Sequence, residues 1–130
     1  MNHAALDQYK SVGVQSGMMD ATPHQMIAML FDGALDRVAS AKGAIERNDV
    51  GRKGELLSSA ISIIDGIRAS LDYDRGGEIA VNLASLYDYI ERRLVEANVA
   101  SDVALLDEVS SLLKDLQSGW DSIPGDLRKG

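Results

Sequence analysis

Apolar side chains recur every three or four residues along four stretches of the chain, which is the period of an α-helix with one buried face. The first stretch begins at Thr22 and runs out at residues 48–51. The second covers about residues 52–72, the third about 78–97, and the fourth follows Asp102 and ends before Pro124. The pattern therefore predicts four helices of about 20 residues, each about 30 Å long.

Start and stop signals support these boundaries. The run Thr22–Gln25 places a capping hydroxyl before a proline at the first helical position, with glutamine three residues after the cap. Residues 74–77, with the sequence Asp-Arg-Gly-Gly, are typical of a turn between helices. Asn98 is expected to end the third helix, and Asp102 is expected to cap the fourth.

The connections between the four helices are short, so neighbouring helices are expected to run antiparallel. We therefore predict an all-α fold, an antiparallel up-down four-helix bundle over residues 22–123. Residues 1–21 are expected to form a mobile N-terminal arm, as chain termini commonly do, or a short extra helix. The helix is an alternative because Leu6, Tyr9 and Val12 recur at every third position. Residues 124–130 are expected to be a loose tail.

Composition narrows the function classes. The chain has 130 residues, no cysteine and a formal net charge of −7. The acidic balance argues against binding of nucleic acid or of an anionic membrane, because both need clustered lysine and arginine. No apolar run reaches membrane-spanning length, and no secretory signal opens the chain. Together with the lack of cysteine, this favours a cytoplasmic protein without membrane insertion.

Side chains with catalytic or metal-binding chemistry are scarce. The two histidines, His3 and His24, have no aspartate or glutamate three residues before them and do not match a di-iron bundle motif. No cysteine or histidine cluster suits zinc, and no serine has a histidine base beside it. His24 is interpreted as a solvated residue of the first helical turn. We therefore expect no enzyme activity, no metal and no cofactor.

Some apolar residues exceed what a small bundle needs for its core. Leu57 and Ile61 widen the apolar arc of the second helix beyond the roughly 100° of an ordinary core face. Val81, Tyr89 and Val95 lie off the main stripe of the third helix. Such residues are either scattered over the surface, which is common, or part of a groove for a partner.

Several short motifs match one protein family in their order and spacing. The match begins at Tyr9, continues through Thr22–Ile27 and Met29–Leu35, and covers nearly the whole chain. Further matching segments are Leu71–Asp72, Gly76–Ala80, Asn82–Leu83, Leu86–Ile90, Leu94, Ala97–Asn98 and Trp120. Phe31 departs from the family pattern, in which tyrosine is common, and the Met18–Met19 pair is added in the arm. By these motifs the chain resembles the flagellin-specific export chaperones of bacterial flagellar assembly, the FliS family.

The resemblance implies an antiparallel helical bundle that acts as a cytoplasmic export chaperone and not as an enzyme. Such a protein binds the disordered C-terminal segment of flagellin, prevents premature polymerisation and presents the subunit to the flagellar export gate. The client-binding groove is expected to include Leu57, Ile61, Ile64, Leu83, Tyr87, Ile90 and Val95. Leu6, Tyr9 and Val12 in the arm are expected to cover this groove and, once displaced, to contact the export gate. We expect a monomer or a weak homodimer.

Two alternatives from other classes stay open. A signalling or phosphotransfer bundle needs a histidine that accepts phosphate, and His24 is the candidate. A plain oligomerising bundle would use its extra apolar residues for self-association. A further open point concerns Tyr87 and Tyr89, which stand two positions apart on one helix and cannot both face the core.

Overall fold

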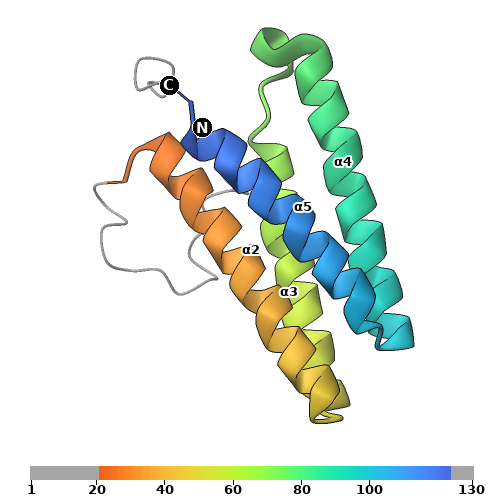
Figure 1. The fold of residues 1–130 in the computed structure, drawn as a ribbon. Coiled ribbons are helices and arrows are strands. Elements are labelled where there is room, and N and C mark those ends of the chain that lie inside the picture. The colour runs from red at the N-terminus through yellow and green to blue at the C-terminus, as the bar shows by residue number, and fades with distance from the viewer. Residues whose placement is uncertain (1–20, 124–130) are drawn as a thin grey trace.

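The computed structural model describes residues 21–123 and shows four helices joined by short connections (Figure 1). The helices are α2 (Pro23–Glu46), α3 (Val50–Ala69), α4 (Tyr73–Ala100) and α5 (Val103–Asp121). Both α2 and α4 pack against α3 and α5, which closes a ring of antiparallel neighbours. The described residues contain no strand. The prediction of an all-α four-helix bundle is therefore confirmed, while the arm residues 1–20 and the tail lie outside the described residues.

Two of the predicted helix starts are confirmed by their caps. Thr22 Oγ1 accepts a hydrogen bond from the Gln25 amide at 3.1 Å, and Gln25 Oε1 accepts one from the Thr22 amide at 2.9 Å. This pair is the expected capping box, which satisfies two amides that the first turn of α2 leaves without helical partners. Asp102 caps α5, with its Oδ1 2.9 Å from the Ala104 amide nitrogen.

Two other boundaries differ from expectation by two residues. The N-cap of α3 is Asp49, whose Oδ1 lies 3.1 Å from the Arg52 amide nitrogen, so the helix begins at Val50 and not at residue 52. At its other end, α4 continues past Asn98 to Ala100. The helix ends there because Ser101 takes a left-handed conformation, with φ of 50°.

The start of α4 departs further from expectation. The helix was expected to begin at residue 78, yet it spans Tyr73–Ala100 with a break at Gly77, where φ is 51° and ψ is −125°. Only glycine adopts such angles readily, so Gly77 redirects the chain between a first helical turn and the regular helix. The N-terminal part of α4 stands away from α5 (Figure 1). Ile79, two residues after this break, has the helical spacing to Leu83 that favours a core position, yet it is 71% exposed.

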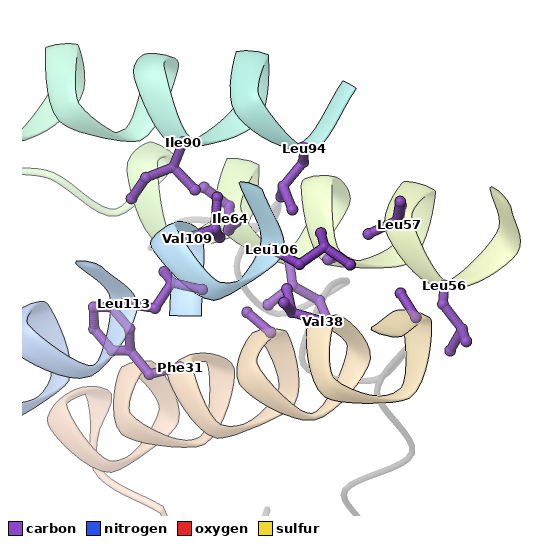
Figure 2. Packing of buried hydrophobic residues seen from close by; sticks show 14 of the residues in the cluster. Phe31, Val38, Leu56, Leu57, Ile64, Ile90, Leu94, Leu106, Val109 and Leu113 are labelled. Atoms are coloured by element: carbon purple, nitrogen blue, oxygen red, sulfur yellow. The ribbon is translucent and has the colours of Figure 1, made fainter. Parts of the chain in front are cut away.

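Apolar side chains from all four helices meet in one core (Figure 2). The largest fully buried side chains are Phe31, Leu30, Leu57, Ile63, Ile64, Ile90, Leu94, Leu106, Leu113, Val38 and Val109. Burial of each such side chain contributes about 1.5–3 kcal/mol relative to exposure. The core therefore holds the faces of α3 and α4 in fixed register, which positions the side chains that remain outside it.

A buried lysine joins the beginning of α3 to the end of α4. Lys53 Nζ donates hydrogen bonds to the Asn98 carbonyl at 2.8 Å and to the Ser101 hydroxyl at 2.7 Å. The Asn98 carbonyl belongs to the last turn of α4, where carbonyls lack helical partners. Lys53 therefore stabilises the turn that leads into α5.

We expect Lys53→Met to lower the free energy of unfolding by about 1–3 kcal/mol, because methionine keeps the packing of the stem but donates no hydrogen bond. Urea unfolding followed by circular dichroism measures the change. Lys114→Met, at an exposed position of α5, is the matched control and should change stability by about 0.5 kcal/mol or less. Equal losses in the two variants would contradict the role assigned to Lys53.

Candidate functional site

Four of the seven groove residues named from the sequence lie in the core. Leu57, Ile64, Tyr87 and Ile90 are each at most 4% exposed. Burial also raises the pKa of Tyr87 to about 12, because the apolar surroundings disfavour the phenolate. In this structure these four side chains support the surface from beneath and do not line it.

Ile61 and Val95 come together on the face between α3 and α4. Ile61 follows Leu57 by four residues on α3, so it lies next to the core stripe but at the edge of its arc. Val95 is 52% exposed and directly follows the buried Leu94 on α4. Both residues line a shallow depression of about 530 Å³. The remaining lining residues are Asp88, Glu91, Arg92 and Glu96.

Leu83 lies elsewhere on the bundle. It precedes Val95 by twelve residues on α4, which corresponds to about 18 Å along a helix that rises about 1.5 Å per residue. Its side chain is half-buried and packs against the core, as does that of Leu86. The structure therefore joins only Ile61 and Val95 of the seven residues in one surface feature.

A network of charges lies along the α3–α4 seam beside the depression. Arg68 on α3 contacts the Asp88 carboxylate on α4, and its Nη2 lies 2.6 Å from Asp65 Oδ1. Glu91 Oε2 lies farther from this guanidinium, 3.7 Å from Nη2. Burial of Glu91, together with the neighbouring Asp65 carboxylate, raises the pKa of Glu91 to about 7, and Arg68 opposes part of that rise. The Arg68 guanidinium thus lies near three carboxylates, those of Asp65, Asp88 and Glu91.

The sequence reasoning missed these charged lining residues. None of them was among the groove residues named from the sequence, and Asp88 pairs with Arg68 on the neighbouring helix. A usable signal was present, because Asp88, Glu91 and Val95 follow one another at spacings of three and four residues and so share one face of α4.

Tyr87 and Tyr89 of α4 point in different directions. Tyr87 faces the core, whereas Tyr89 is half-buried and donates a hydrogen bond to Glu108 Oε2 at 2.7 Å. Arg93 lies over the Tyr89 ring, 5.4 Å from its centroid, and donates to Glu108 Oε1 at 2.9 Å. Tyr89 therefore belongs to the α4–α5 contact, and neither tyrosine lines the depression.

The interpretation of His24 as a solvated residue is wrong. His24 is 7% exposed, and its Nε2 lies 2.8 Å from the Trp120 carbonyl oxygen. The two rings stack with centroids 4.6 Å apart and planes 8° apart. The carbonyl can only accept a hydrogen bond, so Nε2 carries a proton and donates it. Nδ1, the other ring nitrogen that could accept phosphate, belongs to the same buried ring. The geometry therefore disfavours the phosphotransfer alternative.

The described residues also bear on membrane insertion and metal binding. No helix among residues 21–123 combines the length and apolar character of a membrane span. In the same range, no three histidine, cysteine, aspartate or glutamate side chains gather as a metal site would require. The arm residues Leu6, Tyr9 and Val12 lie outside the described residues.

Comparison with known proteins gives the chain its family. Residues 5–126 match the family model described as "Flagellar protein FliS". The chain is 50% identical over 119 residues to "Flagellar secretion chaperone FliSB" of Pseudomonas aeruginosa, covering 92% of this chain and 94% of that protein. It is 47% identical over 121 residues to the flagellar secretion chaperone FliS of Salmonella typhimurium, covering 92% and 90%. The Bacillus subtilis protein of the same name is 36% identical over 106 residues, covering 82% and 78%. The chain therefore belongs to the FliS family of flagellar proteins.

Proposed function

We propose that this chain is a cytoplasmic export chaperone that binds the disordered C-terminal segment of flagellin. By holding that segment it prevents premature polymerisation and presents the subunit to the flagellar export gate. The family match supports a chaperone, because the relatives are named flagellar secretion chaperones. The choice of client segment rests on the resemblance and on the surface of the bundle.

One observation carries the proposal: Ile61 and Val95, from two different helices, line the same depression beside the core. A depression between helices that offers two apolar side chains among charged ones suits the binding of an amphipathic helix, whose apolar side chains contact Ile61 and Val95. A disordered segment that folds on binding buries about 1,000–3,000 Å² in total. The depression therefore takes one part of the client, and the remainder extends over neighbouring surfaces.

The N-terminal arm remains part of the proposal. Leu6, Tyr9 and Val12 would cover apolar surface in the free chaperone and contact the export gate after the client displaces them. The start of α2 at Pro23 places the root of the arm beside the end of α5 (Figure 1). From there, an arm of about 20 residues is long enough to reach any face of the bundle, since an extended chain spans about 3.3 Å per residue.

We expect Ile61→Asp and Val95→Asp each to weaken binding of a flagellin C-terminal peptide about tenfold or more, because each places a charge against the apolar side of the bound helix. Isothermal titration calorimetry with the peptide measures the affinity, and circular dichroism checks the helix content. Val81→Asp is the matched control, since Val81 is also a valine of α4 and is 53% exposed. It should bind the peptide as the unaltered protein does.

Equal affinities for Val95→Asp and Val81→Asp would count against the depression as the client site. The oligomerising alternative makes a different prediction for the same variants. If these residues served self-association, Ile61→Asp would dissociate a dimer in sedimentation experiments and leave peptide affinity unchanged.

A further inference from the structure

We infer that the flagellin segment docked in the α3–α4 depression carries a lysine or arginine that pairs with Glu91. This inference rests on the proposed function, since it names a feature of the client that the same depression recognises.

The charges along this seam are unbalanced. Among the described residues, the carboxylates at the depression and in the adjoining network are Asp65, Asp88, Glu91 and Glu96, and the cations are Arg68, Arg92 and Arg93, of which Arg93 pairs with both Glu96 and Glu108. Arg68 is committed to Asp65 and Asp88 by its closest contacts. The seam is therefore complementary to a segment that brings an additional positive charge.

Glu91 is the carboxylate that a docked cation would serve best. Its Oε2 atom is buried and has no hydrogen-bond partner within residues 21–123, while the Glu91 side chain as a whole is 17% exposed. Arg68 Nη2, at 3.7 Å, lies beyond hydrogen-bonding distance from it. A buried acceptor left in this state costs free energy, and a donor from a partner removes that cost. Because Glu91 also lines the depression, a partner seated there can supply the donor.

The apolar lining fits the stem of the same side chain. Lysine and arginine place their methylene groups along apolar surface while the charged end reaches a polar partner. Ile61 and Val95 provide that surface within the depression that Glu91 lines. The site thus matches a segment in which a basic residue stands among apolar ones.

Protonation of Glu91 provides an independent readout. Glu91 in the free protein has a pKa of about 7 and is faced by Asp65 and Arg68 from α3 and by Asp88 and Arg92 from α4. A docked cation favours the charged carboxylate, so binding lowers this pKa and releases a proton at or below neutral pH. The affinity is therefore expected to rise as pH increases toward about 7 and to level off above it.

The test is a double-mutant cycle between the full-length protein and a flagellin C-terminal peptide. Each lysine or arginine of the peptide is replaced in turn by norleucine or citrulline, and affinities are measured from pH 5.5 to 8. We expect one replacement to weaken binding to the unaltered protein about tenfold and to have little effect on Glu91→Gln. Glu91→Gln should also lose the rise in affinity with pH. Glu55→Gln, on an exposed side of α3, makes the same charge change away from the depression and should keep both effects.

The outcomes separate the two proposals. If the unaltered peptide binds, and every replacement affects the unaltered protein and Glu91→Gln equally, the inference about Glu91 is overturned and the client site stands. The same holds if the pH dependence persists in Glu91→Gln. If the peptide does not bind the unaltered protein at all, the proposed function fails and the inference fails with it.

Discussion

Replacing Ile64 with alanine is expected to lower the free energy of unfolding by about 2–5 kcal/mol. Ile64 is 0% exposed and belongs to the core formed by all four helices (Figure 2). Alanine removes three carbon atoms there and leaves a cavity that the packed neighbours fill only in part. Urea unfolding at constant pH measures the loss, which is large beside the roughly 5–15 kcal/mol by which most domains are stable.

Ile61→Ala is the matched control, because the two isoleucines are three residues apart on α3. Ile61 is half-buried, and the depression beside it lets solvent replace the removed atoms. We expect a loss of about 1 kcal/mol or less for this variant. Similar losses at both positions would mean that Ile61 belongs to the core, which would remove the main support for the client site.

The number of helices and most of their boundaries follow from local signals in the sequence. The capping box at Thr22 and the cap at Asp102 depend on contacts within three residues, so reading the sequence suffices to find them. At Gly77 the sequence predicts only a turn between helices and not a break within one helix. The consequence of the break for Ile79 depends on the path of the backbone, which periodicity does not describe.

The candidate site was predictable only in part, for a related reason. Periodicity shows how wide the apolar arc of α3 is, but it does not show which part of the arc the next helix covers. In the folded bundle Leu57 and Ile64 are buried, and Ile61 is left half-buried at the edge. The sequence also does not show which charged residues pair between helices. The contacts of Arg68 with carboxylates of α4 and the burial of Glu91 are therefore known only from the structure.

His24 is the clearest case of a residue whose role depends on a distant partner. Its first-turn position suggested solvent, yet Trp120, 96 positions later, covers it. The Trp120 Nε1 donates a hydrogen bond to the His24 carbonyl at 2.9 Å, while the His24 ring donates to the Trp120 carbonyl. Two reciprocal hydrogen bonds and a ring stack therefore connect the start of α2 to the end of α5.

We expect Trp120→Ala to lower the free energy of unfolding by about 3 kcal/mol, because it removes the stacked ring and leaves the His24 carbonyl without its donor. His24→Ala should cost about 1–3 kcal/mol for the corresponding reasons. Since each variant already abolishes the shared contact, the double variant should be more stable than the sum of the single losses implies, by about 0.5–3 kcal/mol. Urea unfolding of the four proteins measures this coupling.

A further variant separates the ring stack from the hydrogen bond. Trp120→Phe keeps an aromatic ring against His24 but has no Nε1 donor, so its loss should fall between zero and that of Trp120→Ala. Additive losses for His24→Ala and Trp120→Ala would show that the two residues stabilise the bundle independently. In that case the reciprocal contact would not hold α2 to α5, and the root of the arm at Ala21 would not be fixed by the end of α5.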